Sequence, residues 1–242
     1  MIMPYLAAAL IVGLVITVHE WGHLLAAKWC GIPVERFSVG FGPKLFGFRR
    51  GGTSYWLSVV PIGGYVLPAL DADAFRRLPL RKSILFALGG PVANVVAAYL
   101  GLVVLGSVQF ELSAVGAVSF AATRLWLDAQ AMVHAIALLF AGMDQISGIV
   151  GIVAIGGSKF GSTLVGLLVF SVAINLNLAV FNLLPLPPLD GGRIVFALLQ
   201  KIYQPLYRLQ VPVTLVGWVC MLALMVYATI QDIGRLGLSM LS

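Results

Sequence analysis

The sequence has few charged residues for its length. Only 10% of its 242 residues are Asp, Glu, Lys or Arg, whereas 60% are hydrophobic. A soluble domain carries about 25% charged residues, so this chain cannot cover a folded surface in water. The scarcity of charge excludes a soluble enzyme, a nucleic-acid-binding protein and a disordered chain. It predicts an integral membrane protein whose surroundings are the lipid bilayer, and no nucleic-acid partner is expected.

Acidic residues and cysteines are also few. Nine acidic residues stand against fifteen basic ones, and twelve of the basic residues fall within residues 28–82 and 193–208. Short segments rich in Lys and Arg stay in the cytoplasm, so both segments are expected to face it. The two cysteines, Cys30 and Cys220, are expected at the end of one span and inside another, which argues against a disulfide.

Four hydrophobic stretches are long enough to cross a bilayer, because a spanning helix needs roughly 20 mostly apolar residues. They cover residues 4–29, 84–108, 162–184 and 211–230. Residues 109–160 are ambiguous, and the apolar but interrupted stretch 125–143 suits an interfacial or peripheral helix. The sequence therefore predicts an α-helical polytopic membrane protein with about four core transmembrane helices, forming a single domain over residues 1–242.

The region between the first two spans has the composition of strands. Residues 33–67 contain aromatic and β-branched runs separated by glycine, and Arg49-Arg50-Gly51-Gly52 is typical of a hairpin turn. Non-helical backbone at membrane depth needs protein or a water-filled cavity to satisfy its edges. We predict a small sheet here that re-enters the membrane beside the helices.

The first span contains three ionisable residues, in the order His19-Glu20-Trp21-Gly22-His23. A charge inside a membrane helix costs several kcal/mol, so ionisable residues there indicate function. Residues four apart share a helix face, which lets both imidazoles bind one metal ion. The glutamate beside them can take a proton from the attacking water. This is the spacing of zinc proteases, and it predicts a zinc site with Glu20 as the catalytic base.

Two histidines leave that site incomplete, because a catalytic zinc site usually has three protein ligands. Asp190 follows an apolar span and three prolines, which stop the helix, and precedes two glycines that permit a tight turn. We expect Asp190 to be the third ligand of one zinc ion per chain. The alternative is that it caps a helix beginning near Arg193. His134, the remaining histidine, is expected on the polar face of a surface helix.

Together these motifs resemble the site-2 protease family of intramembrane zinc metalloproteases, in particular the bacterial enzymes that cut anti-sigma factors. The similarity lies in residues 19–23, 37–43, 61–66, 89–94 and 182–191. It implies a re-entrant β-structure in the second and third of these segments and zinc ligation by Asp190. It also implies that Asn182, and with it Asn177, holds the substrate or transition state. Asn94 is a further candidate for substrate binding. This residue either supports the active site or only joins two helices.

The resemblance also implies a substrate and a location. The substrate would be a transmembrane helix that another protease has already trimmed, cut in regulated intramembrane proteolysis at a prokaryotic inner or plasma membrane. The active site would lie nearer the cytoplasmic side. Many bacterial relatives carry PDZ domains between the second and third core helices, but only about fifty residues lie there in this chain, too few for a typical domain. We therefore expect a form without a PDZ domain.

Two other classes of function remain open from the residues alone. In a zinc transporter or metal sensor, His19, His23 and Asp190 would form a transit site, but Glu20 would then have no role and no second metal cluster marks a pathway. In a catalytically silent scaffold that binds transmembrane helices, the zinc-protease spacing would be without purpose.

Overall fold

The computed structural model describes residues 2–139, 149–161 and 163–239. Four of its helices are long and apolar enough to cross a membrane: α1 (Met3–Trp29), α3 (Leu80–Gln109), α6 (Leu164–Asn182) and the stretch Arg208–Gly234 of α8 (Tyr207–Ser239). They coincide with the four predicted spans to within a few residues at each end. The prediction of a polytopic helical membrane protein is confirmed.

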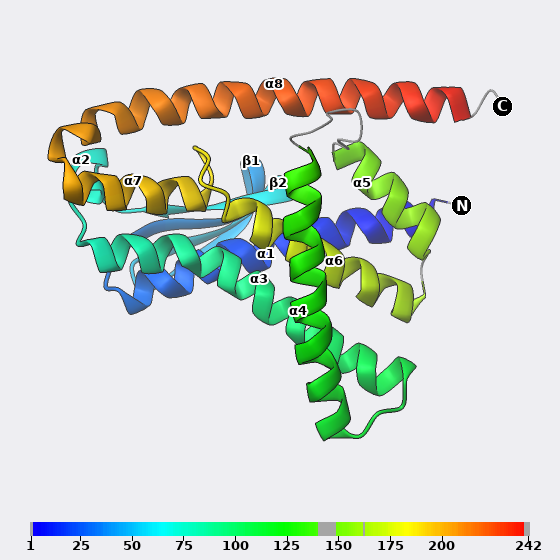
Figure 1. The fold of residues 1–242 in the computed structure, drawn as a ribbon. Helices are drawn as coiled ribbons and strands as arrows, with labels where there is room; N and C mark the ends of the chain where they lie inside the picture. The colour runs from blue at the N-terminus through cyan, green and yellow to red at the C-terminus, as the bar shows by residue number, and fades with distance from the viewer. Residues whose placement is uncertain (1, 140–148, 162, 240–242) are drawn as a thin grey trace.

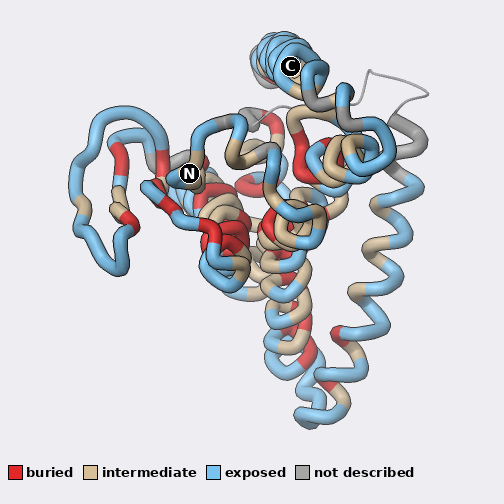
Figure 2. The backbone as a smooth tube through the Cα atoms, turned by 90° about the vertical axis from the view of Figure 1, so that its left-hand side faces the viewer, coloured by how far each residue is buried: buried red, intermediate tan, exposed pale blue. Residues whose placement is uncertain are grey.

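The core consists of α1, α3 and α6, which pack side by side with α3 in the middle (Figure 1). Small and branched side chains such as Ala98 and Leu102 of α3 meet Val172 and Leu176 of α6, and all four are buried. Figure 2 shows that buried residues follow these central helices, whereas α8 is mostly exposed. A buried polar contact holds the C-terminal part of α8, where the Asp232 carboxylate accepts a hydrogen bond from the Gly151 amide at 2.8 Å.

The predicted sheet is present and consists of β1 (Val34–Arg50) and β2 (Thr53–Pro68). Gly51 and Gly52 form the connecting turn with φ of +56° and +80°, values that glycine adopts without strain. The buried side chains of Val34 and Phe37 pack with Leu24 of α1, which fixes the sheet against the core. The structure contains no membrane, so the depth of the sheet in the bilayer stays a prediction.

The pairing register leaves residues 64–67 of β2 at an edge of the sheet that lies beside α1. Residues 36–39 of β1 pair with residues 64–67 of β2 on one side and with residues 54–57 on the other. Within the described ranges, no other strand pairs with residues 64–67. Their outer edge is therefore free to accept a further strand.

The remaining elements are short or peripheral. They are α2 (Ala72–Arg76), α4 (Ala114–Leu139), α5 (Ile149–Ile155) with the π-turn η2 (Gly156–Phe160), α7 (Asp190–Ile202) and the 3₁₀ turn η3 (Gln204–Leu206). The α4 helix is not among the candidate spans, in line with the peripheral helix predicted over 125–143. It begins earlier than predicted, because Ala117 and Ala121 pack one turn apart against the core and small residues give a weak hydrophobic signal. Residues 140–143 of that prediction lie outside the described residues.

Candidate metal centre

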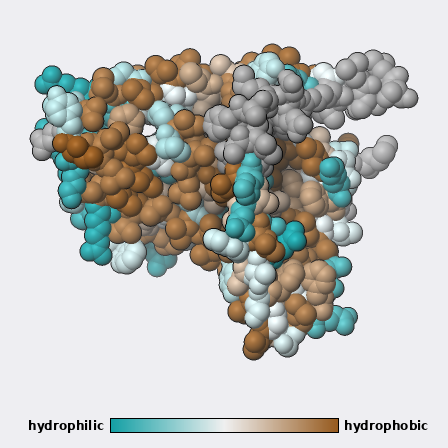
Figure 3. All heavy atoms as spheres, in the orientation of Figure 1, coloured by the Kyte–Doolittle hydropathy of each residue, from teal (hydrophilic) through white to brown (hydrophobic). Residues whose placement is uncertain are grey.

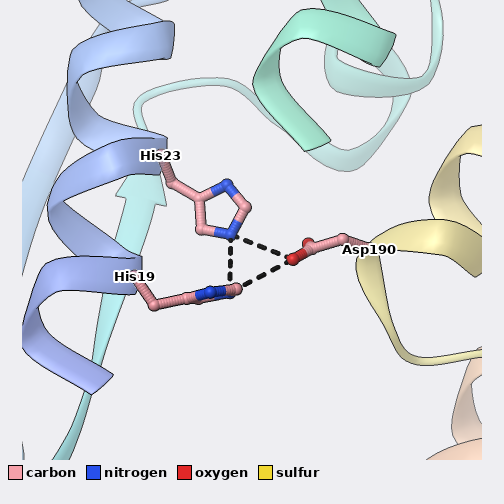
Figure 4. A group of neighbouring side chains, drawn as sticks. All are labelled: His19, His23 and Asp190. Atoms are coloured by element: carbon pink, nitrogen blue, oxygen red, sulfur yellow. Dashed lines mark hydrogen bonds and ion pairs between the residues drawn. The ribbon is translucent and has the colours of Figure 1, made fainter. Parts of the chain in front are cut away.

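Three buried side chains from the two ends of the chain meet at one point (Figure 4). His19 and His23 lie four residues apart on the same face of α1, and their Nε2 atoms are 3.2 Å apart. Each Nε2 atom is also 3.2 Å from Oδ2 of Asp190. The structure thus brings the three predicted ligands into a triangle with equal sides.

The hydrogen bonds of the two imidazoles decide which nitrogen atoms face that triangle. His23 Nδ1 donates to the carbonyl oxygen of Phe86 at 2.8 Å, and His19 Nδ1 donates to Oδ1 of Asn94 at 3.0 Å. A carbonyl oxygen only accepts, so each Nδ1 carries the hydrogen and each neutral ring keeps a lone pair on Nε2. Metal-binding histidines are held in this way in other proteins.

The triangle fits a metal ion. Oδ2 of Asp190 is buried and has no hydrogen-bond donor, and two imidazole lone pairs face it. Three electron-rich atoms in a buried site repel one another unless a cation lies between them. Tetrahedral zinc with bonds of about 2.0–2.1 Å separates its ligands by about 3.3 Å, which matches the observed sides. The donor set of two imidazoles and one carboxylate also suits zinc.

Asp190 is the first residue of α7. Leu189 precedes it at the helix cap without a capping side-chain bond, and the carboxylate of Asp190 points to the histidines. The alternative role as a cap for a helix near Arg193 is therefore wrong, because α7 already begins at Asp190. The Arg193 guanidinium, with Nη1 3.9 Å from Oδ1, favours the charged form of Asp190, and a carboxylate is the form in which aspartate binds a metal.

Close contact between α1 and α3 leaves room for the site only because α3 has glycine there. A Cβ atom built on Gly90 would lie 2.5 Å from Nε2 of His23 and 2.6 Å from Nε2 of His19. At the adjacent positions, a Cβ atom on Gly22 would overlap the carbonyl oxygen of Gly89. Small residues allow such close helix packing in membranes.

Asn94 is buried next to the metal centre and does not line the pocket that opens beside it. It is completely buried, and its Nδ2 donates to Oδ1 of Asn175 at 3.0 Å and to the carbonyl of Val15 at 3.4 Å. The expectation that Asn94 binds substrate is corrected, since no face of it reaches the surrounding pocket. Its hydrogen bond to His19 favours support of the active site over a residue that only joins helices, and its other bonds also link α1, α3 and α6.

A pocket of about 380 Å³ opens beside the triangle. Glu20, which is half-buried, and Asn182 line it together with the three predicted ligands. The open edge of β2 forms another wall, and a Cβ atom on Gly64 would lie 3.3 Å from Cγ of Glu20. The pocket therefore places a carboxylate, an amide and an unpaired strand edge around one metal centre.

Two other predicted positions lie away from this pocket. Asn177 is exposed on α6, does not line the pocket, and donates to the carbonyl of Ala173 at 3.0 Å. His134 is exposed on α4, as expected for a surface helix. Among the described residues, His19, His23 and Asp190 form the one group able to share a metal ion.

Sequence reasoning missed three contributors to the site. Phe86 acts through its backbone carbonyl, which no side-chain pattern reveals. Gly90 acts through the absence of a side chain. Asn175 acts through the side chain of Asn94 and not by direct contact with the ligands. Its bond to Asn94 became apparent once α3 and α6 were adjacent, although two asparagines in separate spans already suggested partners.

Comparison with known proteins identifies relatives along most of the chain. The model of peptidase family M50 matches residues 7–226. A predicted zinc metalloprotease of Campylobacter jejuni is 26% identical over 350 aligned positions, covering 97% of this chain and 94% of the relative. Another from Brucella suis is 52% identical over 116 positions, covering 39% of this chain and 30% of the relative. The regulator of sigma-E protease of Salmonella typhimurium is 41% identical over 105 positions, covering 38% of this chain and 23% of the relative. This chain thus matches under a third of the length of the last two relatives.

Proposed function

The chain belongs to peptidase family M50, the site-2 protease family, and on this premise we propose that it cuts transmembrane segments of membrane proteins in regulated intramembrane proteolysis. It is an integral membrane zinc metalloprotease by family and by its apolar helices. One zinc ion per chain would be held by His19, His23 and Asp190. The observation that carries this proposal is the buried triangle of three lone-pair atoms.

The chemistry divides between the ion and the residues around it. Zinc, when bound, lowers the pKa of water to about 7 and polarises a peptide carbonyl. Glu20 in the pocket wall takes the proton of the attacking water and passes it to the leaving amine. The amide of Asn182, which also lines the pocket, donates a hydrogen bond to the oxyanion that develops on the peptide.

The open edge of β2 supports a role in holding the substrate. A transmembrane helix hides its carbonyl groups in internal hydrogen bonds, so it must unwind before cleavage. An unwound segment can pair with residues 64–67 as an added strand, which would bring its backbone past Glu20. The substrate we propose is a transmembrane helix whose outer domain another protease has already removed.

The distribution of basic residues supports a location. Residues 28–82 and 193–208 carry most of the Lys and Arg residues, and the metal centre lies close to both segments. We propose that the protein resides in a prokaryotic inner or plasma membrane with its active site nearer the cytoplasm.

The decisive experiment is cleavage of a tagged transmembrane substrate by the purified protein, with and without a zinc chelator. We expect cleavage that the chelator abolishes and added zinc restores. A transporter would instead move zinc across vesicles without cutting, and a scaffold would bind the substrate but leave it whole. Either result, or cleavage that the chelator does not affect, would contradict the proposal.

A further inference from the structure

A second, larger cavity adjoins the metal pocket. It measures about 1070 Å³ and lies between α2, the beginning of α3, α7 and the beginning of α8. These elements meet at one end of the molecule (Figure 1). Phe86, Leu189, Arg193 and Trp218 line both this cavity and the metal pocket, so the two spaces are neighbours that share a wall.

Basic residues from distant parts of the chain converge on the larger cavity. Arg77 comes from the end of α2, and Arg193 and Lys201 come from α7. Hydrophilic atoms gather at this end of the molecule in Figure 3. Among the described residues of the lining, one acidic residue, Asp73, stands beside these three cations and does not balance them. The cavity therefore favours an anionic occupant.

Two of the three cations remain available to such an occupant. Among the described residues, Arg77 and Lys201 form no ion pair, whereas the guanidinium of Arg193 pairs with Oδ1 of Asp190 at 3.9 Å. Apolar side chains such as Phe196 and Leu215 line the same cavity and exclude part of the solvent. Charges beside low-dielectric walls are screened less than charges on an open surface.

We propose that this cavity binds an acidic stretch of the substrate next to the segment that is cut, on the cytoplasmic side. The assignment rests on the proposed function. A chain bound in the metal pocket can continue into the larger cavity past Arg193, which lines both. A lipid headgroup would meet the same cations, but the shared wall with the metal pocket favours the peptide. Acidic side chains near the cut would thus be a specificity determinant of the enzyme.

The test uses three tagged substrates that are identical except for four residues beyond the transmembrane segment, which are acidic, neutral or basic. Binding is measured in detergent with the E20Q variant, and cleavage with the unaltered protein. We expect tighter binding and a higher kcat/KM for the acidic substrate, by about tenfold over the basic one, because each partly exposed ion pair contributes modestly. Equal binding and cleavage of all three substrates would overturn the assignment.

Charge reversal separates a direct contact from a structural effect. The R77E/K201E variant, which leaves Arg193 in place, should reverse the preference in favour of the basic substrate. The control R49E/R50E changes two exposed basic residues outside the cavity and should keep the acidic preference. A preference that is unchanged in R77E/K201E would refute the assignment.

Two further outcomes distinguish the occupant and the underlying function. An acidic preference that is lost in phosphatidylglycerol vesicles but kept in phosphatidylcholine vesicles would assign the cavity to an anionic lipid headgroup and overturn the proposal. An acidic preference in binding without cleavage of any substrate would support the cavity assignment and contradict the protease function instead. Cleavage of all three substrates without a preference would support the protease function and contradict the cavity assignment.

Discussion

The side-chain oxygen of Asn94 lies 3.0 Å from Nδ1 of His19, so a buried residue of α3 decides which nitrogen of an α1 histidine faces the metal centre. The same asparagine donates to Asn175 of α6. The position of the first ligand therefore depends on how three helices pack, and not only on the helix that carries it.

Replacing Asn94 with Ala should lower zinc affinity by roughly 10- to 100-fold, because an unsupported imidazole loses its orientation and its fixed hydrogen. Metal titration of the purified variant measures this effect. Ser107→Ala is a control on the same helix, since Ser107 is exposed and its hydroxyl donates to the carbonyl of Val103 on α3. Equal affinities in both variants would contradict the supporting role.

Replacing Glu20 with Gln should reduce cleavage by about 10²- to 10⁴-fold while zinc stays bound, because the amide cannot accept the proton of the attacking water. Cleavage rate and metal content are measured on the same sample. Glu35→Gln serves as the control, because Glu35 is exposed and lies outside the pocket. Full activity of the Glu20 variant would contradict the role of Glu20 as the catalytic base.

Asp190→Ala should lose zinc more severely than a change in a supporting residue, for which a cost of about 10- to 100-fold is typical. The carboxylate is the third atom of the triangle, and without it two imidazoles alone would hold the ion. Asp128→Ala, which removes an ion pair with Arg124 on α4, should keep the metal. An unchanged metal content in the Asp190 variant would refute its role as a ligand.

Gly90→Ala should abolish metal binding, although it adds a single methyl group. That carbon atom would occupy space beside both Nε2 atoms, so α3 would have to move away or the imidazoles would have to turn. Gly234→Ala is the control, because a Cβ atom there meets nothing within 4 Å. Zinc content and thermal unfolding of the two variants test the prediction, and normal zinc binding by Gly90→Ala would contradict it.

Asn182 and Asn177 can be separated by kinetics. Asn182→Ala should lower kcat by about 10²- to 10³-fold with zinc retained, as expected when a donor to an oxyanion is removed. Asn177→Ala should have no effect on kcat, since Asn177 is exposed and does not line the pocket. A loss of activity in the Asn177 variant alone would reverse this assignment.

The sequence predicted those parts of the fold and site that depend on local pattern. Long apolar stretches predicted the four spans, and the composition of residues 33–67 predicted the sheet. The spacing of His19 and His23 predicted that both lie on one helix face. Asp190 was found because prolines and glycines near it signalled an irregular chain. Each of these signals lies within a short segment.

Features that arise from packing between segments could not be predicted in this way. The pairing of residues 36–39 with two separate parts of β2 requires the strand to be folded first. Asn94 was a candidate for substrate binding because its neighbours were unknown, and its full burial against Val15 and Asn175 argues against that role. A polar residue in a span signals an interaction, but the partner is decided by helix contacts.

The metal triangle also has a consequence for the stability of this nearly cysteine-free chain. His23 and Asp190 belong to the first and seventh helices, and most of the described fold lies between them in the sequence. An ion bound to both would act as a reversible cross-link that closes a very long loop, and cross-links of this kind stabilise a fold by restricting the unfolded chain. The three side chains that would bind the catalytic ion would then also connect α7 to α1. Loss of zinc would lower the stability of the fold as well as abolish activity.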